Sequence, residues 1–232
     1  MKFKDNGISS LEDWFEKAPP KMGAFHWKDG RSAKELARYF TKNYPTLPLE
    51  IENVLSSFAD NTASFDWFAE YVTPFDLYGF GSGEGRNHDA IIFGNGIFVG
   101  VEGKSYEPFG QLVKEWLANA TFNKLARINR MKEMLWANVP KNIDNLRYQL
   151  ISASCGTLLE AKTRGYKRAI LMIIELRNPN LYKNSLMQNA SDLDLFISSF
   201  DREKEGNLTK LNTPFSTENG IDFYITKISI DL

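Results

Sequence analysis

The residues of this chain with the clearest chemical potential are Asp89, Glu102 and Lys104, which stand at the outer ends of two short apolar runs. Asn95 and Gly96 separate the runs, and Asn-Gly between apolar residues is a strong hairpin signal, because both turn residues need positive φ. This turn pairs the runs as antiparallel strands and places Asp89 opposite Glu102. Because side chains alternate along a strand with a period of two, Lys104 falls on the same face as Glu102. The pattern predicts two carboxylates and one ammonium on a single patch.

Such a patch has the chemistry of a cation site. Like charges directly opposite each other destabilise a sheet, and a divalent cation shared by Asp89 and Glu102 would remove that repulsion. Mg²⁺ (or Mn²⁺) suits the pair, because Mg²⁺ typically takes one or two carboxylates and keeps waters for a substrate phosphate. Two alternatives stay open. The charges could be solvated hairpin ends in which Lys104 pairs with either acid, and a one-residue slip would move one partner to the other face.

Composition narrows the class of protein. The chain has 232 residues, of which 43% are hydrophobic, enough for one sizeable core. Its net charge of −1 gives no global basic field, which argues against a nucleic-acid substrate without excluding one, since local basic clusters occur. The single cysteine, Cys155, rules out an internal disulfide framework. No apolar run approaches the roughly 20 residues that span a membrane. We expect a soluble, cytoplasmic protein.

Helical periodicity dominates the first part of the chain, and we expect a helical region over residues 1–60. Ser10 is a plausible helix cap, Ser32 with Glu35 forms a capping-box pattern, and a third helix follows Pro48. An irregular strand should come next, followed by a flexible loop at the glycine-rich "GFGSGEGR".

After the hairpin, Glu107 and Pro108 suit the start of a helix whose positive end would lie near the carboxylates. Asp144 is placed to cap a long helix that ends at Gly165. A buried strand, a helix and a last strand follow in "AILMIIEL", "SDLDLFISSF" and "DFYITKISI". The order predicts a mixed α/β fold in a single domain over 1–232.

The strand–hairpin–helix–strand order, with Asp89 on the first hairpin strand and Glu102-Gly103-Lys104 on the second after a twelve-residue gap, resembles the PD-(D/E)XK superfamily. These are metal-dependent nucleases with a restriction-endonuclease-like fold, a mixed β-sheet flanked by helices. The text "EGKSYEPFG" with the later "LRYQL" looks closer to a family of bacterial proteins of uncharacterised function linked to the same fold. The resemblance covers a core of roughly residues 70–178.

The resemblance implies roles for individual residues. Asp89 and Glu102 would hold the metal, and Lys104 would orient the attacking water and stabilise charge on the phosphate. Gln149 matches the glutamine that many superfamily members carry near the site on the following helix. Arg147 is a second candidate on that helix for contacting phosphate, although about 160° separates it from Gln149 around the helix.

Other positions remain open. Arg86, at the end of the glycine-rich loop, is a candidate phosphate contact. Glu35 and Glu70 are unranked candidates for the further ligand that an early helix often supplies. His88 replaces the proline that often precedes the motif aspartate; we expect an exposed loop histidine, with a position behind a metal ligand as the alternative. Cys155 is expected to be a small buried residue.

Two functions follow from this pattern. The first is a Mg²⁺-dependent nuclease that hydrolyses DNA or RNA, and the second is a nuclease-like module that binds protein or nucleic acid without cutting. The intact Asp–Glu–Lys set favours the first, while the neutral net charge favours the second. A homodimer is a state to test, because many double-strand cutters of this fold act in pairs.

Overall fold

The computed structural model describes residues 2–3, 7–60, 63–81, 83–137, 142–178 and 183–232. The strands in these ranges are β1 (Lys2–Phe3), β2 (Ser64–Thr73), β3 (Arg86–Gly94), β4 (Ile97–Lys104), β5 (Arg168–Arg177), β6 (Asp201–Glu205), β7 (Leu208–Asn212) and β8 (Asp222–Asp231). The α-helices are α1 (Leu11–Lys17), α2 (Ser32–Thr41), α3 (Leu49–Ser56), α4 (Val113–Trp116), α5 (Phe122–Trp136), α6 (Tyr148–Thr163), α7 (Lys183–Ser198) and α8 (Pro214–Asn219). Two 3₁₀ turns, η1 (Gly23–Phe25) and η2 (Phe75–Tyr78), complete the described elements.

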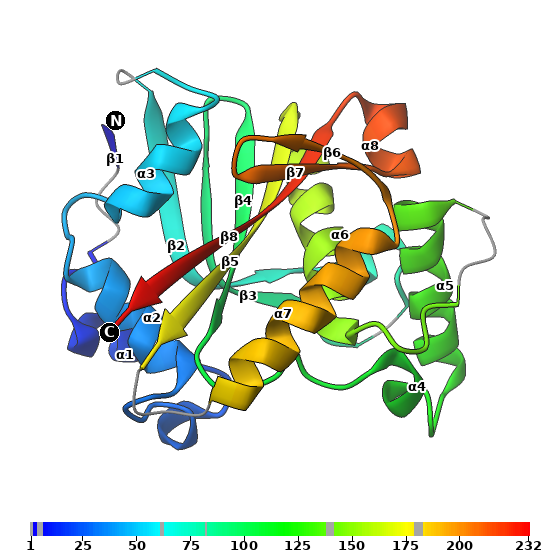
Figure 1. Ribbon diagram of the computed structural model, residues 1–232, viewed down its shortest axis with the longest axis horizontal. Coiled ribbons are helices and arrows are strands. Elements are labelled where there is room, and N and C mark those ends of the chain that lie inside the picture. Colours follow the sequence, from blue (N-terminus) through cyan, green and yellow to red (C-terminus); the bar gives the residue numbers. More distant parts are fainter. Residues whose placement is uncertain (1, 4–6, 61–62, 82, 138–141, 179–182) are drawn as a thin grey trace.

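Within the described ranges, eight strands form one sheet in the order β1-β2-β3-β4-β5-β8-β7-β6. The pairs β2–β3, β3–β4, β8–β7 and β7–β6 are antiparallel, whereas β1–β2, β4–β5 and β5–β8 are parallel. Helices cover the sheet on both sides (Figure 1). The protein therefore has a mixed α/β architecture, as the sequence predicts.

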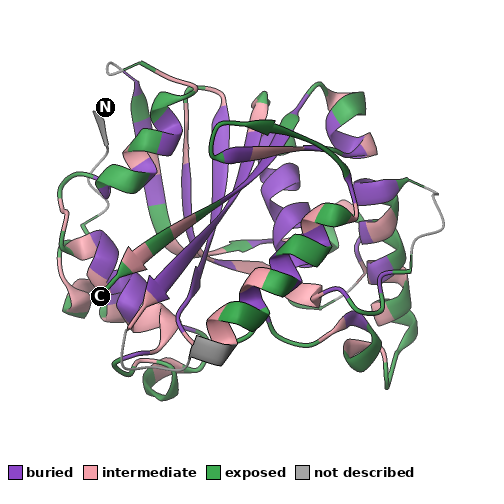
Figure 2. Ribbon diagram, viewed as in Figure 1, coloured by how far each residue is buried: buried purple, intermediate pink, exposed green. Residues whose placement is uncertain are grey.

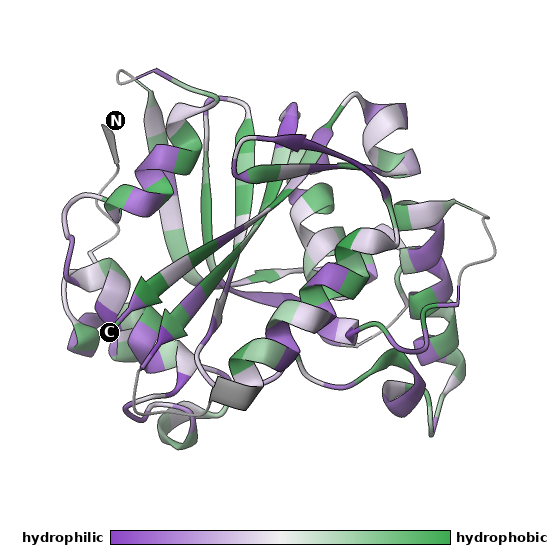
Figure 3. Cartoon of the chain, in the orientation of Figure 1, coloured by the Kyte–Doolittle hydropathy of each residue, from purple (hydrophilic) through white to green (hydrophobic). Residues whose placement is uncertain are grey.

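Two hydrophobic clusters lie on the two faces of this sheet. One joins the sheet to α1–α3, and the other joins it to α5, α6, α7 and α8. The central strand β5 is buried from Ala169 to Leu176, which matches its continuous apolar sequence (Figures 2 and 3). The edge strand β6 is exposed along its whole length and consists mainly of charged residues.

The hairpin register expected from the Asn-Gly turn is confirmed. Gly94 pairs with Ile97, and the next two pairs follow in the predicted order. Asn95 and Gly96 have φ values of 49° and 74°, as a type I′ turn requires. The ladder reaches Ala90 opposite Val101, so Asp89 lies at the first position beyond it.

The prediction that a helix begins at Glu107 and Pro108 is wrong, because the helix in this segment begins at Val113. The described helix there is the short α4, because Gly110 takes a left-handed φ of 65° and turns the chain first. The described helix therefore begins at Val113, after this turn, and not directly after Lys104.

The start of α6 also differs from the prediction. The helix begins at Tyr148 rather than after Asp144, because the preceding residues pair with the segment before α4. The Val113 amide donates to the Leu146 carbonyl at 2.9 Å, and the Tyr148 amide donates to the Gln111 carbonyl at 3.0 Å. These hydrogen bonds hold residues 111–113 against residues 146–148 at the start of α6, and we call this contact the clasp. The C-terminal end is as expected, with Gly165 in a left-handed conformation directly after the helix.

Two smaller differences concern the N-terminal and C-terminal regions. Glu35 does not complete a capping box with Ser32; its carboxylate accepts a hydrogen bond from the Gly30 amide at 2.7 Å. The antiparallel pair β6–β7 and helix α8 were not predicted, although Gly206 marks the turn between the two strands. None of the helices in the described part of the chain is long and apolar enough to cross a membrane.

Candidate active site at the bend of the sheet

A local break in the sheet positions the carboxylates. The β2–β3 ladder is interrupted at one position, where Glu70 stands opposite Asp89. Glu70 has a φ of 48°, a left-handed conformation that is rare for a residue with a long side chain. Ala69 contacts the cluster on the α1–α3 side, whereas Tyr71 contacts the cluster on the α6 side. Residues two apart in a strand normally share a face, so the faces exchange at Glu70, where β2 and β3 bend sharply (Figure 1).

The exchange of faces also explains the position of His88. Its side chain is fully buried, which corrects the expectation of an exposed loop histidine. The imidazole occupies space left by Gly100 and Gly156, since a Cβ on Gly156 would lie 2.7 Å from His88 Nε2. His88 Nδ1 lies 3.6 Å from Glu102 Oε1, too far for a hydrogen bond, and burial lowers the pKa of His88.

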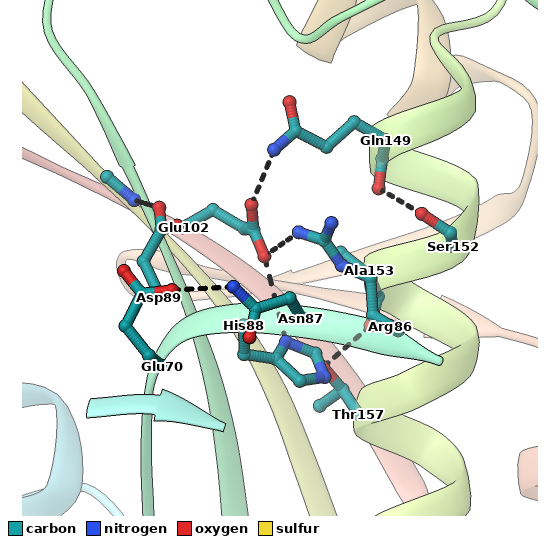
Figure 4. Close-up of polar contacts among 11 residues, drawn as sticks. Glu70, Arg86, Asn87, His88, Asp89, Glu102, Gln149, Ser152, Ala153 and Thr157 are labelled. Carbon is teal, nitrogen blue, oxygen red and sulfur yellow. Dashed lines mark hydrogen bonds and ion pairs between the residues drawn. The ribbon is translucent and has the colours of Figure 1, made fainter. Parts of the chain in front are cut away.

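Glu102 is fully buried and held from two sides (Figure 4). Gln149 donates from Nε2 to Glu102 Oε2 at 2.9 Å, and Arg86 forms an ion pair with Glu102 Oε1. Burial by itself would raise the pKa of Glu102. The Arg86 guanidinium, together with smaller contributions from His88 and Lys104, outweighs burial, and the pKa of Glu102 falls to about 2. Glu102 is therefore ionised, and the Arg86 guanidinium balances its charge.

Asp89 and Glu70 have the opposite electrostatics. Asp89 Oδ2 accepts a hydrogen bond from the Gly103 amide at 2.8 Å, and Glu70 Oε2 accepts one from Asn87 Nδ2 at 2.6 Å. Burial and then the charge of Glu102 raise the pKa of Asp89 to about 6. Burial and then the charge of Asp89 raise the pKa of Glu70 to about 8. Neither acid forms a salt bridge within the described part of the chain, and the charges of Lys104 and Arg86 offset only part of the rise in pKa.

Both acids line a cavity of about 280 Å³. Its other lining residues come from the hairpin, the segment before α2, the start of α2 and the start of α6: Pro20, Lys21, His26, Arg31, Ser32, Ala33, Arg86, Asn87, Lys104, Glu107 and Gln149. Lys104 is 6% exposed, and its ammonium lies 5.6 Å from the centroid of the Phe109 ring. The cavity thus brings together one ammonium, one guanidinium, one amide and two acids from the predicted set and its open candidates.

The placement distinguishes between candidates that the sequence left open. Of the two glutamates considered as a further ligand, Glu70 lines the cavity. Glu35 does not: its carboxylate accepts a hydrogen bond from the Gly30 amide and forms an ion pair with Arg38. Gln149 faces Glu102, while Leu150 is fully buried on another side of α6, as the helical spacing predicts.

Of the two arginines predicted to bind substrate, the structure brings Arg86 to the cavity but not Arg147. Arg147 Nε donates to Asp192 Oδ2 at 2.7 Å, and its Nη1 donates to the Gly110 carbonyl at 2.8 Å. Its position two residues before Gln149 directs it to another side of the chain at the start of α6, toward α7. The assignment of Arg147 as a phosphate contact at this site is corrected accordingly.

Sequence reasoning missed several residues of the cavity wall. Arg31 and Ser32 reach it from the start of α2, and the Ser32 amide donates to Glu107 Oε1 at 3.2 Å. These residues lie more than 50 positions before the hairpin, and no local pattern connects the two segments.

The fold and the cavity define a mixed α/β protein with an acidic and basic cluster at the bend of its sheet. A family model described as "Domain of unknown function (DUF6946)" matches residues 7–232, and the chain belongs to this family. Searches among curated proteins and among solved structures found no match.

Proposed function

We propose that this protein is a Mg²⁺- or Mn²⁺-dependent nuclease of the PD-(D/E)XK type that hydrolyses phosphodiester bonds in nucleic acid. One observation carries the proposal: Asp89 and Lys104 of the hairpin and Gln149 of α6 line one cavity, and Gln149 also binds the fully buried Glu102. The order of β2, the β3–β4 hairpin, α6 and β5 supports it, because that is the order which the resemblance implies.

The acids of the cavity fit a divalent cation. The pKa values of Asp89 and Glu70 are raised by burial and by neighbouring negative charge, and a cation between them would relieve both effects. In the described part of the chain, no group of three or more His, Cys, Asp or Glu side chains is arranged to hold a metal. Two carboxylates are nevertheless enough for Mg²⁺, which keeps several waters. The proposal assigns the ion to Asp89 with Glu70, and Glu102 is the neighbouring candidate that Arg86 now holds.

The chain's own residues then have distinct tasks in hydrolysis. A bound metal would act as a Lewis acid toward water and phosphate. Lys104 is placed to donate to a phosphate oxygen and to offset the charge that develops there. Water oxygen bonds to phosphorus as the bond to the leaving ester oxygen breaks; the attacking water releases one proton to solvent, and the leaving oxygen takes one proton from solvent. Gln149 and Arg86 act on Glu102 and keep its carboxylate in place.

A second candidate function is a nuclease-like module that binds nucleic acid or protein without cutting. The observation in its favour is the ion pair between Arg86 and Glu102, which gives this buried carboxylate a resident cation. In this alternative, the cluster stabilises the bend of the sheet and needs no metal.

A cleavage screen separates the two functions. The wild-type protein is incubated with single-stranded and double-stranded DNA and RNA in Mg²⁺, in Mn²⁺ and in EDTA. The proposal expects metal-dependent cleavage that Lys104→Ala abolishes. Lys114→Ala is the matched control, because Lys114 is exposed and its ammonium donates to Asn145. Absence of cleavage of every substrate in both metals, by a folded wild-type protein, would favour the binding module.

A further inference from the structure

The cavity is small, and the segment that precedes α2 contributes part of its lining. Its volume of about 280 Å³ lies just below the roughly 300–1,000 Å³ of pockets that enclose a small molecule. Pro20, Lys21 and His26 form one wall, and Gln149 contributes to another. A single nucleotide unit of a flexible strand is of the right order for a space of this size.

The charges of the wall suit a phosphate chain. Lys21, Arg31, Arg86 and Lys104 line the cavity around the acids. Arg31 also lies 3.7 Å from Glu107 and 5.2 Å from the centroid of the Tyr106 ring, so its guanidinium is oriented at the wall. These cations stand beside the acids Glu70, Asp89 and Glu107 in the same lining, so the wall offers cationic groups for phosphate next to the proposed metal ligands.

An exposed aromatic group stands next to the cavity. Phe25 is 58% exposed, and its ring centroid lies 5.6 Å from that of His26, which lines the cavity. The Lys28 ammonium lies 5.1 Å from the centroid of the Phe25 ring. Exposed aromatic rings flanked by cations are typical of surfaces that stack unpaired bases. Bases in a duplex have their faces covered by neighbours, so such a platform selects single strands.

We propose that the cavity takes single-stranded nucleic acid, with one nucleotide unit inside and an adjacent base stacked on Phe25 and His26. This inference rests on the proposed function, because it names the substrate form for the same site. Phe122 provides the contrast: it is 84% exposed on α5, a helix that contributes no lining residue to the cavity, whereas Phe25 directly precedes the lining residue His26. The proposal therefore depends on the position of Phe25 beside the cavity and not on its exposure alone.

The test is the binding of fluorescent oligonucleotides, measured by anisotropy in EDTA so that no strand is cut. The probes are a single-stranded DNA, a single-stranded RNA of the same sequence, and the blunt DNA duplex. We expect at least one single strand to bind tenfold or more tightly than the duplex, and the two single-stranded arms to show which sugar is preferred. Phe25→Ala should weaken that binding by about tenfold, Phe25→Trp should retain it, and Phe122→Ala should leave it unchanged.

The outcomes separate this inference from the proposed function. Equal or tighter binding of the duplex overturns it, as does equal binding by the Phe25→Ala and Phe122→Ala proteins. If single strands are preferred through Phe25 but Mg²⁺ and Mn²⁺ support no cleavage, the nuclease function fails while the preference for single strands stands.

Discussion

Gly156 on α6 and His88 on β3 are in such close contact that a Cβ on the glycine would lie 2.7 Å from His88 Nε2. The imidazole is fully buried and sits beside Glu102. The glycine therefore has a packing role that its place in the middle of a helix would not suggest, since glycine costs a helix about 1 kcal/mol relative to alanine.

The first prediction concerns this contact. Gly156→Ala should destabilise the protein by about 1–3 kcal/mol through overpacking, despite the better helix propensity of alanine. In a His88→Ala background, the same substitution should cost much less, because the new methyl group fills vacated space. Urea unfolding of the four proteins of this double-mutant cycle measures the coupling. Additive effects would show that His88 does not depend on the glycine.

The second prediction concerns Arg86. Arg86→Met should destabilise the protein in EDTA by about 3–5 kcal/mol at neutral pH, because it leaves the buried Glu102 carboxylate without its cation. The loss should be smaller near pH 5, where Glu102 can take up a proton once the guanidinium no longer lowers its pKa. Arg130→Met is the control, since its ion pair with Glu133 is exposed and should contribute less than about 1 kcal/mol. A loss of equal size in both variants would contradict the role given to Arg86.

The third prediction concerns metal binding. Mg²⁺ or Mn²⁺ that binds only the folded protein at a hundredfold excess over Kd should stabilise it by about 2.7 kcal/mol, a rise in Tm of a few degrees. Wild type should show the rise and Asp89→Asn and Glu70→Gln should largely lose it, while Glu102→Gln should keep more of it because Arg86 holds that carboxylate. Thermal unfolding in EDTA and in excess metal gives the comparison. The same response in all four proteins would mean that these acids hold no cation.

The fourth prediction is a pH dependence of stability in EDTA. The pKa of Asp89 is raised from 3.8 to about 6 and that of Glu70 from 4.5 to about 8. The folded state therefore binds these protons more tightly than the unfolded state, and stability should fall as pH rises from about 4 to 8. Glu102 acts in the opposite sense: its pKa of about 2 means that its contribution is lost as pH falls below 4.5.

Asp89→Asn is the test of that pH window. The amide keeps an oxygen for the Gly103 amide, so at neutral pH the variant should be as stable as wild type in EDTA, or more so. Its stability should also vary less between pH 5 and pH 8. A variant that is less stable than wild type at pH 8, with the same pH slope, would count against repulsion between the acids.

The fifth prediction concerns Gln149. Gln149→Ala should leave the fold intact but lower metal-dependent cleavage by roughly 10–100-fold, the usual effect of removing a partner that orients a ligand. Gln188→Ala is the matched control, since Gln188 also donates its amide to a carboxylate, that of Asp192, at 2.9 Å. Equal activity of the two variants would remove Gln149 from the site.

The parts of the site that could be predicted from the sequence depend on short-range rules. The Asn95-Gly96 turn defined the hairpin register, and that register placed Asp89 beside Glu102. Helical spacing placed Gln149 and Leu150 on different sides of α6. These predictions held because each depends on a period or a turn type that a few neighbouring residues determine.

The failures have tertiary causes. His88 was expected in solvent because no local pattern reveals that the faces of β2 and β3 exchange at Glu70, where the backbone takes a positive φ. The start of α6 was placed too early because Leu146 pairs with Val113, a contact between segments more than 30 residues apart. Gly110 stopped a helix that the apolar spacing favoured.

The clasp between the segments before α4 and α6 has an evolutionary consequence. Leu112 and Arg147 form an antiparallel β-bridge. The segment between them, which contains α4 and α5, therefore begins and ends at the same place, close to Gln149. Insertions or deletions between the two ends would change the excursion that contains α5 without shifting the start of α6, since lengthening a loop costs little once its ends are held together. An insertion in the exposed stretch 118–121 would therefore lengthen this excursion while the contact between Gln149 and Glu102 is kept.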